Sequence, residues 1–440
     1  MMKPINNKYL LLILLLVGIS FSAGAQQQFT LQECIDIALK NNRDVRQQQL
    51  TRQQREIAYS QARADLLPNL NASVGQSFVF GRSIGLDNVY QNTNSAQTSF
   101  GISSNITLFD GLKMKHNIDA RKADLSASDA DLEKIEDDIV MSVSTAFLQV
   151  LLTKELLQIA VDQLEVTNAN ITRSNELVKN GKLAQGELFE IEAQAAKEEL
   201  NRVQAESNLK IALLDLAQIM EMERFAHFDI SAPPVETLIN ESQLLSSNSV
   251  YESALLNRPE IRGAKYRIVS GEKELSMAKS QYFPSLSFGA QMGTGYYRMS
   301  EIENASFASQ VRNNMSNSLG FSLSIPIFNR FQIRNSVKNA EIALESVKLN
   351  LDKTKLQLRK SIEQAYYNAL GAQSRWKAAQ KSEIASREAY RFAQQKYDNG
   401  RTTPYELFQA KSNLTQVLGE QAQAKYEYAF RLKILELLKD

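Results

Sequence analysis

The chain has 440 residues, of which 43% are hydrophobic and 22% are charged, values typical of a folded protein rather than a disordered one. Its 50 Lys and Arg residues nearly balance its 49 Asp and Glu residues, so the net charge of +1 gives no electrostatic basis for binding nucleic acid or another acidic polymer. Only 8 prolines and 18 glycines are present, which favours long uninterrupted helices.

The first 25 residues have the pattern of a secretory signal peptide. Lys3 and Lys8 precede a short apolar run at residues 9–19, and an A-x-A pattern predicts cleavage after Ala25. The alternative is a membrane anchor, but the run is too short to span a bilayer comfortably. Beyond it no stretch offers about 20 consecutive apolar residues, so a mature chain that enters a membrane must do so as a closed β-barrel.

Landmarks that recur at nearly one spacing indicate an internal duplication. Pro68 and Pro284 are 216 positions apart, each followed two residues later by a leucine. The pair Asn180-Gly181 recurs 219 positions later as Asn399-Gly400. We therefore expect four parts: a signal peptide (1–25), a first repeat (26–222), a linker (223–249) and a second repeat (250–440).

Each repeat predicts the same order of elements. An amphipathic helix stops at a proline, two short alternating segments follow, and a very long helix ends at an Asn-Gly pair before a return helix. The expected helices cover about residues 31–66, 111–178 and 184–222, and then 250–282, 330–397 and 404–438.

The two longest helices, at about seventy residues, would each be roughly 100 Å long, far deeper than a globular core. We expect them to pack along their length as coiled coils. Apolar residues such as Val143, Phe147 and Val150 follow the spacing of a heptad in the first, and small residues such as Ala365 and Ala369 follow it in the second. A solvated rod is the alternative.

Four segments alternate apolar with small polar residues and predict strands, at about 69–80, 99–108, 286–292 and 319–327. Their length of about ten residues suits a strand tilted across a bilayer. Polar loops at about 82–97 and 298–317 would join them in two hairpins. Lipid tolerates no free strand edges and bacterial barrels begin at about eight strands, so several copies would have to pool their hairpins. The alternative is a soluble four-stranded sheet packed on the helices.

The segment from Tyr397 to Ala410, YDNGRTTPYELFQA, follows the pattern Tyr-x-x-Gly-x-x-(Ser/Thr)-x-x-(Asp/Glu)-(Val/Leu)-x-x-Ala. With the duplicated order of elements, it resembles the TolC-like outer-membrane efflux protein family over nearly all of the mature chain. The corresponding segment of the first repeat, from Val178 to Leu188, matches this pattern less well.

The resemblance implies a mainly α fold with a small β part, in which long antiparallel coiled coils and two β-hairpins per protomer form a trimeric α/β-barrel channel. It implies a homotrimer with twelve strands and twelve tunnel helices, placed in the outer membrane with a large periplasmic part. It also implies contact with outer-membrane lipid, with a periplasmic adaptor protein and, through that adaptor, with an inner-membrane pump.

Five residues fall at the periplasmic entrance by this resemblance. Glu406 matches an acidic residue that lines the entrance, and Glu187 is its counterpart in the first repeat. A threefold ring of carboxylates would favour cations, but Glu406 could instead complement the positive end of its own helix. Gln409 stands where the family has a further acid, and Thr402, beside Arg401, stands where it has a gate arginine, which puts a latch of Arg–Asp contacts in doubt.

The resemblance further implies that the two interhelical turns face the adaptor and that two prolines separate helix from strand. The turn residues are Asn180, Gly181, Lys182, Asn399, Gly400 and Arg401, and the prolines are Pro68 and Pro284.

We find no motif for catalysis, cofactor binding or metal binding. The two histidines, His116 and His227, have no metal-spaced partner, and Cys34 is expected to be a small core residue of the first helix rather than a reactive thiol. No nucleotide-binding glycine loop occurs, so energy for transport would come from a partner.

Three hypotheses follow from these features. The first is the passive exit duct of a tripartite efflux pump for small toxic compounds. The second is the exit duct of a type I protein secretion system. The third, of another class, is a structural coiled-coil spacer or adhesin of the cell envelope.

Overall fold

The computed structural model describes residues 27–84, 88–92, 94–222, 228–231, 235, 239, 244–300 and 303–439. The predicted signal peptide, His227 and much of the predicted linker lie outside these residues. The chain divides into two compact units. The helical unit comprises Met1–Gln49, Leu132–Pro259 and Lys355–Asp440, and the sheet unit comprises Leu50–Asp131 and Glu260–Thr354.

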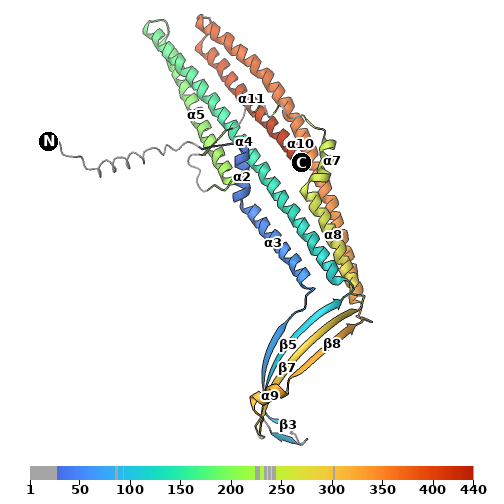
Figure 1. The fold of residues 1–440 in the computed structure, drawn as a ribbon. Helices are drawn as coiled ribbons and strands as arrows, with labels where there is room; N and C mark the ends of the chain where they lie inside the picture. Colours follow the sequence, from blue (N-terminus) through green and yellow to red (C-terminus); the bar gives the residue numbers. More distant parts are fainter. Residues whose placement is uncertain are drawn as a thin grey trace, which may run out of the picture. The chain divides into compact units, whose positions relative to one another are not determined.

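Helices in the same order, with equal or nearly equal lengths, occur in both halves of the chain (Figure 1). Two helices of 67 residues, α4 (Lys113–Lys179) and α10 (Gln332–Asp398), are the long helices that the sequence predicts. Each is followed by a return helix, α5 (Gln185–Ile219) or α11 (Pro404–Lys439). The remaining long elements are α2 (Leu31–Asn41), α3 (Arg43–Ala64), α7 (Ser247–Asn257) and α8 (Pro259–Ser280).

The first helix of each half is divided in two, where the sequence led us to expect a single helix. Asn42 lies between α2 and α3 in an extended conformation, and its side-chain oxygen accepts hydrogen bonds from Asp44 N at 2.9 Å and Val45 N at 3.1 Å. Arg258 lies between α7 and α8 in the same conformation. The residue after it is Pro259, and a proline disfavours helical geometry in the residue before it.

The core of the helical unit begins at Cys34. Its side chain is fully buried beside Val143, Phe147 and Val150 of α4 and Leu216 of α5. Burial and, to a smaller extent, the negative charge of Glu33 together raise the pKa of the Cys34 thiol to about 12. The prediction that Cys34 is a core residue is therefore confirmed.

The second long helix packs through small residues, as its sequence predicts. Ala369 and Ala372 are fully buried, and Trp376 lies one turn further along, where its ring stacks on Tyr428 of α11 at a centroid distance of 5.6 Å. In the described part of the chain, α4 alone has the length and apolar composition of a membrane-spanning helix. The apolar part of α4 is interrupted by polar residues, and we attribute its apolar composition to packing along the coiled coil.

The sheet unit contains a four-stranded antiparallel sheet in the order β2 (Asn71–Val79), β5 (Ser95–Phe109), β7 (Ser285–Met299) and β8 (Ser316–Ser324). The predicted loops hold further structure, namely a small hairpin of β3 (Arg82–Ile84) and β4 (Tyr90–Asn92) and a short helix, α9 (Phe307–Asn313). The two central strands have 15 residues each and extend beyond the predicted segments. Pro326 lies beyond the end of β8 rather than within that strand.

The register places apolar side chains of all four strands on one face, because residues directly opposite each other point to the same side. Ala72 is opposite Ile102, Ile102 is opposite Met292, and Phe288 is opposite Phe321 with ring centroids 4.9 Å apart. The other face carries mainly Gly, Ser, Asn and Gln residues.

The apolar face of the sheet is exposed, as Leu319 at 75% and Val74 at 71% show. A soluble sheet would bury such a face rather than expose it. Both edge strands, β2 and β8, have no further strand beside them in the described sheet. If this apolar face lay in lipid, the unpaired edges would leave the sheet incomplete as a membrane structure.

Candidate functional site

The two interhelical turns have the same hydrogen-bond geometry. Gly181, at φ +70°, donates to Val178 O, and Lys182 N donates to Leu177 O at 2.8 Å. Gly400, at φ +65°, occupies the same position after α10, where Arg401 N donates 2.8 Å to the carbonyl oxygen of Lys396. The two backbone hydrogen bonds in each turn form a Schellman motif, which ends a helix at a glycine and satisfies carbonyl groups of its last turn.

The side chains of both turn asparagines add a second bond at the same place. Asn180 Nδ2 donates to Glu176 O, and Asn399 Nδ2 donates to Gln395 O, each at 2.7 Å. The turn residues are exposed. Both turns therefore present an ordered, solvent-facing backbone, whose conformation needs a glycine at its centre.

The entrance residues of the second repeat meet at the start of α11. The Thr402 hydroxyl donates to the Glu406 carboxylate, and Glu406 N donates to Thr403 Oγ1 at 3.4 Å. Glu406 and Gln409 are exposed. In the first repeat, Glu187 lies in the first turn of α5, where the capping residue Ala184 gives no side-chain hydrogen bond.

Near these turns, an ion pair joins the two halves of the chain. Arg173 of α4 donates through Nη1 to Asp398 Oδ1 of α10 at 2.7 Å. Both side chains are partly exposed, so the pair contributes modestly to stability. In the described protomer, neither Arg401 nor Glu187 forms an ion pair. The Arg–Asp contact found here therefore uses residues other than Arg401 and Thr402 of the predicted entrance.

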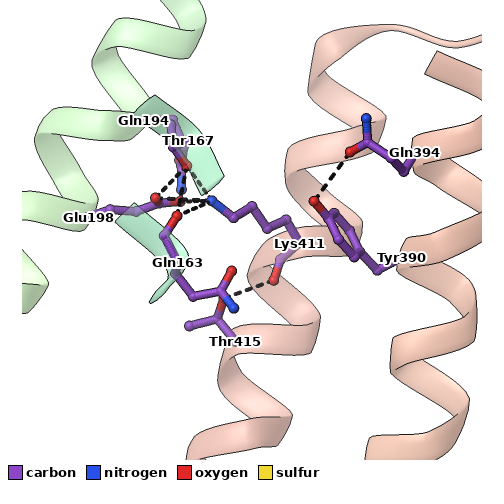
Figure 2. A network of polar contacts seen from close by, with 8 residues as sticks. All are labelled: Gln163, Thr167, Gln194, Glu198, Tyr390, Gln394, Lys411 and Thr415. Atoms are coloured by element: carbon purple, nitrogen blue, oxygen red, sulfur yellow. Dashed lines mark hydrogen bonds and ion pairs between the residues drawn. The ribbon is translucent and has the colours of Figure 1, made fainter. Parts of the chain in front are cut away.

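A buried polar network lies about two turns into α11 (Figure 2). The Lys411 ammonium reaches both carboxylate oxygens of Glu198 on α5 at 3.1 Å. It also donates to the hydroxyl of Thr167 and, at 2.6 Å, to the carbonyl oxygen of Gln163, both on α4. These contacts use the three donors of the ammonium group.

Further hydrogen bonds complete this network. Thr167 Oγ1 donates to Glu198 Oε2 at 2.5 Å, and Gln194 Nε2 donates to Glu198 Oε1 at 2.9 Å. The side chain of Lys411 is 2% exposed and that of Glu198 is 9% exposed. Three helices from both repeats are thus joined at one buried point.

Burial lowers the pKa of Lys411 from its ordinary value, because removal of the charged ammonium from water outweighs the opposing attraction of Glu198. Burial also raises the pKa of Tyr390, and the negative charges of Glu198 and Asp398 add to that effect. The Tyr390 hydroxyl bonds to Gln394 one turn further along α10 at 3.2 Å (Figure 2). The network therefore has an electrostatic influence on the neighbouring helix.

Neither Lys411 nor Glu198 was predicted from the sequence as a functional residue, although the spacing of both residues carries a signal. Glu198 continues the seam of Leu188, Ile191 and Ala195 at heptad spacing. Lys411 lies between Leu407 and Leu414 at the same spacing. A charged residue at each of two seams indicates a buried pair, but only the structure shows that the two seams meet.

Among the side chains that the structure describes, no three His, Cys, Asp or Glu residues gather as a metal-binding cluster.

The model of the family described as outer membrane efflux protein matches residues 34–220 and 250–438. The outer membrane protein TolC of Escherichia coli is 22% identical over 437 residues, which cover 95% of this chain and 84% of that protein. The proteases secretion protein PrtF of Dickeya chrysanthemi is 20% identical over 430 residues, which cover 94% of this chain and 89% of that protein.

A membrane protein from Pseudomonas aeruginosa has the same fold, with a TM-score of 0.77 at 18% identity, over 94% of this chain and 92% of that one. The matches confirm the resemblance seen in the sequence, the outer-membrane location and the mixed fold of long helices and strands. The chain belongs to the outer membrane efflux protein family, whose members are exit ducts of efflux or secretion systems.

Proposed function

We propose that three copies of this chain form a passive duct for small toxic compounds, which an inner-membrane pump drives through a periplasmic adaptor. The observation that carries the proposal is the incomplete sheet. One protomer supplies four strands, with an exposed apolar face and two free edges. Three copies would give twelve strands, above the minimum of about eight for a bacterial barrel.

The turns at Gly181 and Gly400 are the adaptor-facing tips in this proposal. They share one backbone geometry, they are exposed, and they end the longest helices of the chain. The Arg173–Asp398 ion pair connects the helix pair α4–α5 to the helix pair α10–α11 near those tips. An adaptor bound to either turn would therefore act on both helix pairs of a protomer.

The exposed carboxylate of Glu406 lines the periplasmic entrance in the proposed trimer. Three such groups around one axis hold a negative potential that favours cations. The second role considered for Glu406, at the end of its own helix, is also supported, since it lies in the first turn of α11 and accepts a hydrogen bond from Thr402.

A second cargo class is proteins. The name of PrtF assigns that relative to protease secretion, and its likeness covers nearly the whole chain. The duct would be shared by both classes, because the pump selects the cargo.

The proposal is tested in cells that lack their own exit duct but retain a periplasmic adaptor and an inner-membrane pump. Restored export of a fluorescent amphipathic compound supports a small-compound duct, and restored export of a protein alone identifies a secretion duct. Purified protein that never conducts ions in planar bilayers would contradict the duct and favour a structural spacer or adhesin.

A further inference from the structure

The central strand β7 extends past the end of its neighbour β8. The pairing of β7 with β8 stops at Gly293, which is opposite Ser316, while β7 continues to Met299. On its other side, β7 remains paired with β5 as far as Met299 opposite Ser95. The last six residues of β7 therefore have a partner strand on one side only.

Three amide side chains occupy that edge in place of a strand. Asn314 Nδ2 donates to Gly295 O at 2.8 Å. Gln310 accepts from Tyr297 N and donates to Tyr297 O, both at 2.9 Å.

Asn304 makes the same two contacts with the backbone of Met299, each at 2.8 Å. The bonded positions 295, 297 and 299 are two residues apart, as expected for groups that point to the same edge of a strand.

The helix α9 holds these amides in place. The aromatic ring of Phe307 packs edge-on against Tyr296 at 5.3 Å and against Phe100 at 6.3 Å, on the apolar face of the sheet. Thr294 Oγ1 donates to Val311 O at 2.6 Å. Side-chain and ring contacts thus anchor α9 along the uncovered part of β7.

We propose that Asn304, Gln310 and Asn314 form an edge cap that prevents β7 of one copy from pairing with β7 of another copy. A free strand edge is a template for strand addition, and two identical edges can pair about a twofold axis. The inference rests on the proposed ring, which is closed through β2 and β8 and leaves positions 295–299 of β7 without a strand. The cap keeps the channels separate at this rim.

The test uses disulfide formation at Tyr297, whose backbone lies at the centre of the capped edge. A Tyr297→Cys variant in a Cys34→Ala background carries one thiol per copy. With the cap intact, we expect oxidation to give no disulfide-linked dimer. With Gln310→Leu and Asn304→Leu added, we expect linked dimers, because two β7 edges can then bring the thiols within bonding reach.

Asn313→Leu is the matched control, since the Asn313 side chain bonds, within the described part of the chain, to Ser309 of the same helix alone. We also expect the backbone amides of Tyr297 and Met299 to exchange hydrogen at least about tenfold faster in the uncapped variant. If the double variant does not fold, Gln310→Leu alone supplies both readouts.

Unchanged exchange and no dimer in a variant that still assembles would overturn the edge cap. A wild-type protein that forms no oligomer at all would instead overturn the proposed ring, so the two failures are distinguishable.

Discussion

Lys411 Nζ lies 3.1 Å from each carboxylate oxygen of Glu198, and this buried pair joins the return helices of the two repeats. The same ammonium group also donates hydrogen bonds to α4, so Lys411 of α11 contacts both α4 and α5. Buried pairs of this kind often contribute little net stability but are costly to break on one side. The pair is therefore suited to fixing the register of these helices.

The Lys411→Ala substitution should destabilise the protein by roughly 3–5 kcal/mol, because it leaves the Glu198 carboxylate buried without its partner. The combined Lys411→Met and Glu198→Leu variant should recover most of that loss. Chemical unfolding in detergent measures the change. Lys433→Ala, which removes a partly exposed pair on the same helix, is the control and should cost about 1 kcal/mol or less. Equal effects of the two alanine substitutions would exclude a special role for Lys411.

The lowered pKa of Lys411 should make the free energy of unfolding depend on pH. In the unfolded chain the lysine keeps its proton up to about 10.5, whereas the native state releases it at lower pH. Between the two pKa values the unfolded state binds more protons, so the contribution of Lys411 to stability rises with pH in that window. Unfolding curves of the wild type and of the Lys411→Met, Glu198→Leu variant, compared from neutral pH to about 10.5, should therefore differ increasingly in favour of the wild type. A constant difference would contradict the assignment.

Gly400→Val should weaken efflux. The residue has a φ of +65°, a conformation that costs a residue with a Cβ roughly 1–2 kcal/mol and a β-branched residue more. The turn would shift, and with it the surface offered to the adaptor. Gly181→Val should behave alike. Gly186→Ala, in a helix with open space around its Cβ position, is the control and should leave efflux unchanged. Normal export of a fluorescent compound by both valine variants would remove these turns as docking points.

Glu406→Gln should reduce the preference for cations over anions in planar-bilayer recordings, since it removes one carboxylate per copy from the proposed ring. Glu420→Gln, an exposed substitution further along α11, serves as the control. Unchanged reversal potentials in a salt gradient would leave Glu406 only the role of complementing its helix end.

The main outline of the fold could be predicted from the sequence because its strongest signals are local. The Asn-Gly pairs mark the ends of α4 and α10 to within one residue, and the alternation around Phe288 assigns the correct faces to the sheet. The division at Arg258 was missed, although Pro259 marks it.

Other features depend on contacts between distant segments and could not be read from local pattern. Polar residues extend β5 back to Ser95 because β2 and β7 supply hydrogen-bond partners on both sides. Within the predicted polar loop, α9 is held by contacts with β7 and not by a long apolar stripe. The meeting of Lys411 with Glu198 likewise depends on how separate helices pack.

The central claim is that one protomer supplies too few strands to close a wall in lipid. Native mass spectrometry of the protein, extracted from outer membranes in a mild detergent, tests it most directly. The account predicts a single species of three times the protomer mass. A stable monomer under these conditions, with all four strands protected from hydrogen exchange, would contradict it.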